Sequence, residues 1–113
     1  MDSLTEIYEK YAALRSFHDS GATKSYAFRL KALHTLKQTI VLRKNEIKQA
    51  LMLDFKKPEY ETYLSDIGVI TDEIKHTLRH LKSWMKPKTV STPLAIFPGY
   101  NTKIYQESKG VVV

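Results

Sequence analysis

The sequence contains no cysteine among its 113 residues, and only four glycines and four prolines. Without cysteine the chain forms no disulfide, offers no thiolate to zinc and supplies no cysteine nucleophile. No run approaches the roughly 20 uninterrupted apolar residues that a membrane-spanning helix needs. The N-terminus is acidic and lacks the basic and then apolar plan of a secretory signal, so we expect a cytoplasmic location.

Prolines and glycines gather toward the C-terminal end and divide the chain into two unlike parts. Up to about Met85 the apolar residues recur at helical spacing. From Lys86 onward come Pro87, Pro93 and Pro98, with residues of high strand propensity between them. We therefore predict a mainly α fold of three or four amphipathic helices, followed by a short β tail.

The helical part divides at residues that favour caps and breaks. The first predicted helix runs from the capping box Ser3–Glu6 to His18–Gly21. The second runs from near Thr23 to Phe55, with a break near Lys44–Asn45. The third runs from Pro58 to Met85. The last of these has the most regular apolar stripe, namely Tyr60, Tyr63, Leu64, Ile67, Ile70, Ile74, Leu78, Leu81 and Trp84. Within it Gly68 costs about 1 kcal/mol relative to Ala, which predicts close packing there or a slight break.

The β tail holds three short candidate strands. Thr92–Phe97 and Thr102–Gln106 flank a turn around Pro98–Gly99, and Gly110–Val113 is wholly apolar. An apolar run of that kind suits a strand buried in a parallel sheet, which needs a crossover and neighbouring strands. These 113 residues supply neither, so we interpret the sequence as part of a longer chain.

One helix face carries residues that could ligate a metal. Asp72, Glu73, His76 and His80 lie on successive turns, and the Glu-x-x-His and His-x-x-x-His spacings place ligands on one face. A helical two-metal site needs a second such motif, and a zinc protease needs Glu directly after the first His. Neither occurs, so we predict a solvated polar face and no metal site.

The formal charge of +6 invites a nucleic-acid hypothesis. The basic residues are Lys24, Arg29, Lys31, Lys37, Arg43, Lys44, Lys48, Lys75, Arg79, Lys82, Lys86 and Lys88. They spread over every predicted helix and alternate with acidic residues, whereas a nucleic-acid-binding protein gathers them on one surface. Solubility is the simpler use of this charge.

The tyrosines and Arg29 also have structural explanations that need no ligand. Tyr60, Tyr63, Tyr100 and Tyr105 could stack on bases, but the first two belong to the helical stripe and favour core packing. Arg29 precedes residues bound for the core, so we expect a paired, partly buried guanidinium. No glycine-rich phosphate loop, Ser/His/Asp set or catalytic carboxylate pair emerges, and we predict no catalytic residue in this chain.

Several segments in order resemble the opening of aldehyde dehydrogenases. They are Phe17-x-x-Ser20-Gly21, Phe28-Arg29-x-x-x-Leu33-x-x-Leu36, Ala50-Leu51-x-x-Asp54-Phe55-x-Lys57-Pro58, Asp72-Glu73-Ile74, Leu81-Lys82-x-Trp84-Met85-Lys86-Pro87 and Thr92-Pro93-Leu94. The class 3 and fatty-aldehyde branch is the most similar, and the likeness extends from about Tyr11 to Val113. Relatives usually have Glu-Pro-Leu-Gly before the valine run, whereas this chain has Glu107-Ser108-Lys109-Gly110, which loosens the turn there.

The resemblance implies an NAD(P)-dependent oxidoreductase of several times this length, with an α/β fold that includes a Rossmann-like nucleotide-binding domain. Relatives oxidise aldehydes to carboxylic acids through a cysteine thioester, with a Glu as base. None of those residues maps onto this chain, so catalytic, cofactor-binding and metal residues are all expected elsewhere, and the chain alone should be inactive and bind no cofactor.

The resemblance also assigns parts to the chain. Residues 1–88 would form the N-terminal helical layer of the nucleotide-binding domain, 89–109 strands linked to an oligomerisation arm, and 110–113 the start of the first sheet strand. Its partners would be the aldehyde, the remaining domains and further copies in a homo-oligomer, with no nucleic acid. The alternatives are a free-standing helical interaction module and, less favoured, a basic nucleic-acid-binding module.

Overall fold

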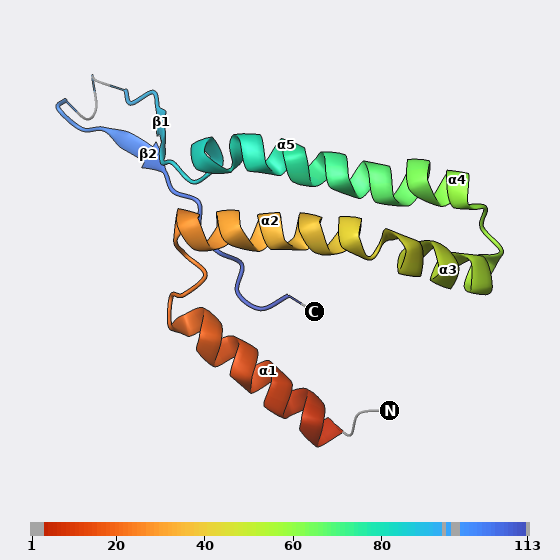
Figure 1. Cartoon of the computed structure of the whole chain (residues 1–113). Helices are drawn as coiled ribbons and strands as arrows, with labels where there is room; N and C mark the ends of the chain where they lie inside the picture. Colours follow the sequence, from red (N-terminus) through yellow and green to blue (C-terminus); the bar gives the residue numbers. More distant parts are fainter. Residues whose placement is uncertain (1–3, 94, 96–97, 113) are drawn as a thin grey trace. The chain divides into compact units, whose positions relative to one another are not determined.

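A computed structural model describes residues 4–93, 95 and 98–112 (Figure 1). The elements are the α-helices α1 (Leu4–Asp19), α2 (Tyr26–Leu42), α3 (Lys44–Phe55), α4 (Glu59–Thr62) and α5 (Val69–Trp84), the π-helix η1 (Tyr63–Gly68), and the strands β1 (Lys88–Val90) and β2 (Thr102–Ile104). The predicted mainly α fold with a short β tail is confirmed. Two compact units are present, Met1–Phe28 with Lys82–Val113, and Arg29–Leu81.

Helix α1 ends as its sequence predicts. The amide of Ser20 still bonds the Ser16 carbonyl, and Gly21 then takes a φ of +76°, which its missing Cβ permits. The Ser20 hydroxyl donates to the Phe17 carbonyl at 2.6 Å and accepts from the Ala22 amide at 3.3 Å. The turn is therefore held by its own side chain. Ser3 of the predicted capping box lies outside the described residues.

Helix α2 begins three residues later than predicted, at Tyr26 instead of near Thr23. Ser25 provides the reason, because its hydroxyl accepts the orphan amide of Phe28 at 3.1 Å and so acts as the cap. The predicted break near Lys44–Asn45 is confirmed, since α2 ends at Leu42 and α3 begins at Lys44. Arg43 lies between the two helices.

Within Arg29–Leu81, α2 and α3 run antiparallel to α4, η1 and α5 and form a helical hairpin (Figure 1). Pro58 begins the returning arm with a φ of −60°, as the sequence predicts for proline at a helix start. The pKa of Asp72 on α5 is lowered mainly by the hydrogen bond and charge of Lys75, then by the charge of Arg79, and last by that of Lys37 on α2.

The core of this hairpin is a single stripe with a spacing of seven residues. Ile67, Ile74 and Leu81 are the buried hydrophobic residues among those described, and Thr62 is fully buried one turn before them. The stripe was predicted, but several of its members are not in the core. Tyr60 and Tyr63 are 76% and 52% exposed, so their predicted core packing is wrong for this chain.

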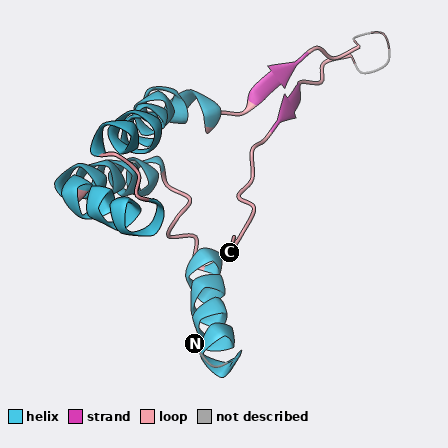
Figure 2. Cartoon of the chain, turned by 90° about the vertical axis from the view of Figure 1, so that its right-hand side faces the viewer, coloured by secondary structure: helices cyan, strands magenta, loops and turns pink. Residues whose placement is uncertain are grey.

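The β tail differs from its prediction at one strand. Strand β2 lies within the predicted Thr102–Gln106, whereas β1 is Lys88–Val90, ahead of the predicted Thr92–Phe97 (Figure 2). The hydroxyl of Thr92 accepts the Thr102 amide at 3.1 Å, and Pro93 has no amide to donate, so the ladder ends before them. Leu94, Ile96 and Phe97 lie outside the described residues.

Residues 110–112 do not form the strand that the sequence predicts, and Val113 lies outside the described residues. A strand requires backbone partners on a neighbouring strand, and β1 pairs with β2 alone in the two-stranded sheet. The predicted strand therefore has no partner within the described residues.

Candidate functional site

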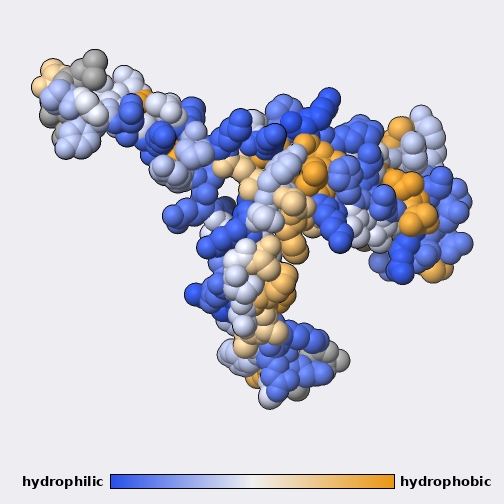
Figure 3. Space-filling model, turned by 60° about the vertical axis from the view of Figure 1, so that its left-hand side comes forward, coloured by the Kyte–Doolittle hydropathy of each residue, from blue (hydrophilic) through white to orange (hydrophobic). Residues whose placement is uncertain are grey.

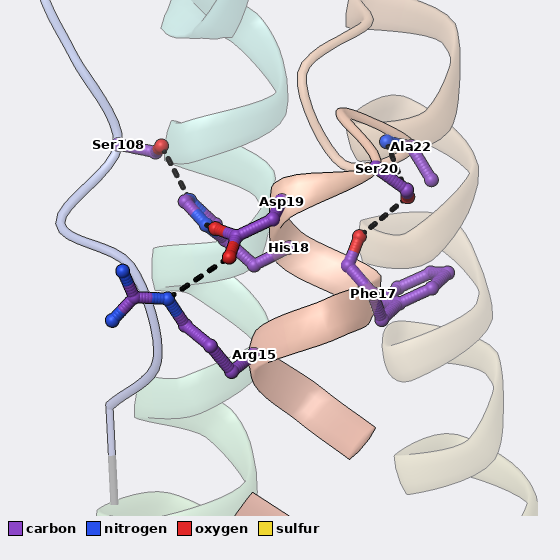
Figure 4. Close-up of polar contacts among 7 residues, drawn as sticks. All are labelled: Arg15, Phe17, His18, Asp19, Ser20, Ala22 and Ser108. Atoms are coloured by element: carbon purple, nitrogen blue, oxygen red, sulfur yellow. Dashed lines mark hydrogen bonds and ion pairs between the residues drawn. The ribbon is translucent and has the colours of Figure 1, made fainter. Parts of the chain in front are cut away.

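The end of α1 and the segment after β2 bring four polar side chains together (Figure 4). We call Arg15, His18, Asp19 and Ser108 the His18 cluster. His18 Nδ1 lies 3.1 Å from Asp19 Oδ1, and His18 Nε2 lies 2.8 Å from Ser108 Oγ. Arg15 Nε donates to the other carboxylate oxygen of Asp19 at 3.1 Å. Ser108 is 90 residues away in sequence, so the cluster links the two ends of the unit.

Hydrogen-bonding roles in the His18 cluster follow from the carboxylate. The pKa of Asp19 lies below its ordinary value because of the hydrogen bond from His18 and then that from Arg15, so the group is ionised and only accepts. His18 Nδ1 must therefore donate. In neutral His18 the lone pair is then on Nε2, which accepts the hydroxyl proton of Ser108.

The sequence did not predict this cluster. The sequence showed no Ser/His/Asp set, because Ser108 lies 90 residues after His18 and no pattern relates it to His18–Asp19. The adjacent pair His18–Asp19 was visible only as part of a helix end. What brings Ser108 to it is the path of the chain after β2, which is a tertiary feature.

The predicted polar face of α5 has a different arrangement from a metal site. The rings of His76 and His80 lie 4.3 Å apart between centroids, and His80 Nδ1 donates to the His76 carbonyl at 2.9 Å. Asp72 is instead bonded by Lys75 at 2.7 Å, which lowers the pKa of that carboxyl. No group of three or more potential metal ligands occurs in the described part of the chain.

The other sequence candidates are not members of the His18 cluster. Arg29 is partly buried, as predicted. Tyr100 and Tyr105, on either side of β2, are exposed. Sequence reasoning and structure therefore point to different residues.

The turn between α3 and α4 is held by two ion pairs. Lys57 Nζ bonds Asp66 Oδ2 at 2.6 Å, and Lys48 Nζ bonds Glu59 Oε2 at 3.3 Å. Both lysine side chains are mostly covered, at 24% and 19% exposure. The bond from Lys57 is the main cause that lowers the pKa of Asp66.

Asp66→Asn is expected to remove a stabilisation that depends on pH. Because the pKa of Asp66 is depressed in the folded chain, its contribution is present above its unfolded value of about 4 and is lost as pH falls through the folded value. Denaturant unfolding at pH 6 and at pH 3 measures this: the variant should be less stable at pH 6, and the difference should shrink at pH 3. In a Lys57→Met background the substitution should have little further effect; a full additive loss there contradicts the pairing.

Hydrophobic side chains reach the surface along most helices (Figure 3). On α1 the exposed large hydrophobic residues are Leu4, Ile7, Tyr8, Tyr11, Leu14 and Phe17. On the hairpin Leu42 and Leu53 are 82% and 85% exposed. Where such side chains form a contiguous patch, the patch commonly marks a site that another surface covers. No helix among the described residues combines the length and the apolar character needed to cross a membrane.

Comparison with known proteins finds relatives of one class. The chain is 39% identical over 100 residues to an aldehyde dehydrogenase of Craterostigma plantagineum, with 88% of this chain and 21% of that protein covered. It is 35% identical over 109 residues to 4,4'-diaponeurosporen-aldehyde dehydrogenase of Staphylococcus aureus, covering 95% of this chain and 23% of the relative. No protein-family model matches the chain.

A solved structure agrees with these relatives. The substrate-bound state of Staphylococcus aureus AldH superposes with a TM-score of 0.79 at 34% identity, covering 87% of this chain and 21% of that one. The chain is therefore similar to the N-terminal part of aldehyde dehydrogenases. Several relatives carry the name of aldehyde dehydrogenase family 3, including member I1 of Arabidopsis thaliana at 37% identity, and the predicted class 3 resemblance is confirmed.

The match covers only a small part of each relative. The chain spans about one fifth of the length of the relatives it matches. A free-standing helical module and a nucleic-acid-binding module, the two alternatives from the sequence, are not favoured by these comparisons.

Proposed function

We propose that this chain forms the helical N-terminal part of an NAD(P)-dependent aldehyde dehydrogenase that oxidises aldehydes to carboxylic acids through a cysteine thioester. The observation that carries the proposal is the TM-score of 0.79 with AldH, at 34% identity over 87% of the chain. Since the 113 residues include no cysteine, the nucleophile must come from other residues of the enzyme.

Within that enzyme we assign residues 1–88 to a helical layer on the nucleotide-binding domain. The exposed apolar face of α1 supports this assignment, because such a face is stable when another surface covers it. We assign 89–109 to strands beside an oligomerisation arm, and 110–113 to the first strand of the nucleotide-binding sheet. The half-buried Gly110 and Val111 lack strand partners here, which the sheet of the remaining domain would supply.

The cofactor, NAD or NADP, is assigned to residues beyond these 113. A dinucleotide site needs closely spaced glycines at a strand-to-helix turn, and Gly21, Gly68, Gly99 and Gly110 lie far apart in the chain. The residues present therefore do not fit this cofactor, and they supply no step of hydride transfer. We further propose a cytoplasmic homo-oligomer that binds aldehyde and no nucleic acid.

The proposal is tested by replacing the matching N-terminal segment of Staphylococcus aureus AldH with this chain. We expect the chimera to form NADH or NADPH with an aliphatic aldehyde, followed by absorbance at 340 nm, and the isolated 113-residue chain to form none. The matched control is a chimera with Ile74→Asp, which places a charge in the core and should lose both its cooperative melt and its activity.

Two results would contradict the proposal. The first is a chimera that melts cooperatively, as AldH does, yet oxidises no aldehyde. The second is dehydrogenase activity from the isolated chain, which would place a nucleophile other than cysteine within the 113 residues.

A further inference from the structure

The His18 cluster joins its atoms in the order of a serine hydrolase site. A carboxylate oxygen of Asp19 faces His18 Nδ1 at 3.1 Å, and His18 Nε2 faces Ser108 Oγ at 2.8 Å. In serine hydrolases the carboxylate orients the imidazole through Nδ1, and Nε2 removes the hydroxyl proton during attack. We propose that Ser108 is an activated nucleophile that takes acyl groups from small activated esters, separately from the aldehyde dehydrogenase function.

The neighbours of His18 set which ring nitrogen carries the proton when the imidazole is neutral. The ionised Asp19 accepts from His18 Nδ1, which leaves the Nε2 lone pair directed at Ser108. Arg15 bonds the second oxygen of Asp19 at 3.1 Å, so the carboxylate is held from both sides (Figure 4). His18 is only 22% exposed, whereas Asp19 is 56% exposed. The imidazole is thus the best covered group in the set, which restricts its rotation.

The chain around Ser108 determines how an ester reaches the hydroxyl and which group can stabilise the oxyanion. Ser108 is exposed and lies in a segment without regular structure, so an ester can approach its hydroxyl. The amide of Lys109 donates no hydrogen bond to the described residues and directly follows the nucleophile. That position supplies one oxyanion donor in α/β-hydrolases. With at most this one donor available, acylation should be faster than at an ordinary serine and slower than in a complete hydrolase.

The reaction balances without any cofactor. Ser108 Oγ attacks the ester carbonyl carbon while its proton passes to His18 Nε2. The bond from the carbonyl carbon to the leaving oxygen then breaks, and the leaving group takes the proton from His18. Water, again deprotonated by His18, attacks the acyl-serine and releases the carboxylic acid and free Ser108. No group is oxidised or reduced.

The test uses p-nitrophenyl acetate with the 113-residue chain under conditions where circular dichroism shows the folded helices. The chain has no cysteine, so no thiol competes for the acyl group. We expect release of p-nitrophenolate together with an acetyl group on Ser108, located by peptide mapping that separates it from acetylated lysines. His18→Gln should slow acetylation of Ser108 by about 100-fold, the lower range for loss of a general base.

Ser20→Ala is the matched control, because the Ser20 hydroxyl donates to a backbone carbonyl and faces no histidine. It should leave the rate at Ser108 unchanged, and Ser20 itself should not be labelled in the parent chain. Acetyl groups confined to lysines and the N-terminus would overturn the proposal, as would equal labelling of Ser108 with His18→Gln. If His18→Gln alters the helical spectrum, the isosteric Asp19→Asn decides instead: slower labelling supports the proposal, and an unchanged rate overturns it.

Discussion

Ile74→Ala is expected to lower the free energy of unfolding of the helical hairpin by about 2–5 kcal/mol. Ile74 is 6% exposed and lies at the centre of the stripe with Ile67 and Leu81, which are the other buried hydrophobic residues among those described. Truncation removes buried methyl groups and leaves a cavity, and both effects destabilise the fold. Total stabilities of small domains are about 5–15 kcal/mol, so this single loss is a large share.

Ile70→Ala on the same helix is the matched control. Ile70 is 48% exposed, and the same truncation there should cost well under half as much, because less apolar surface returns to water. Urea unfolding followed by helical ellipticity measures both variants, and the midpoints give the difference if the slopes agree. Equal losses for the two variants would mean that the stripe is not the core of the hairpin.

The helices were predictable because their signals are local. The seven-residue spacing of Ile67, Ile74 and Leu81 defines one face of a helix in any environment. Pro58 and Gly21 act within their own turns, so the sequence already located a helix start and a helix end there. Errors at helix boundaries came from single side chains, as at Ser25, whose hydroxyl bond to the Phe28 amide shifts the start of α2.

Burial was less predictable, because it depends on what covers a face. Tyr60 and Tyr63 follow the helical stripe, yet both are exposed in this chain, as are the apolar residues of α1. Periodicity identifies a face that favours apolar contact and carries no information on the partner. The chain spans about one fifth of the length of its relatives, and in the proposed enzyme the surfaces that cover these faces belong to other residues.

Contacts between distant segments were the least predictable. The pairing of Lys88 with Ile104 fixes β1 ahead of the segment that strand propensity favoured. Likewise, the bond between His18 and Ser108 depends on where the chain passes after β2. The sequence shows a serine in place of the usual proline and suggests a looser turn; the structure instead gives that serine a hydrogen bond with the end of α1.

Gly68→Ala is expected to destabilise the hairpin, although alanine is the better helix former. The sequence predicted close packing or a slight break at Gly68, and the π-helix Tyr63–Gly68 is such a break. The Thr71 hydroxyl donates to the carbonyls of Ile67 and Gly68 at 2.8 and 2.9 Å, which satisfies acceptors in the irregular turn. Helix propensity alone would favour alanine by about 1 kcal/mol.

Steric contact reverses that preference at Gly68. A Cβ on Gly68 would lie 2.9 Å from the carbonyl oxygen of Tyr63, and this backbone atom cannot move without disturbing the π-helix. Overpacking of this kind costs about 1–3 kcal/mol, so we expect a lower midpoint in thermal unfolding. Val69→Ala is the matched control, since Val69 is 60% exposed in the next position and should change the midpoint little. A higher midpoint for Gly68→Ala would show that the turn relaxes to a regular α-helix and that the π-helix does not depend on glycine.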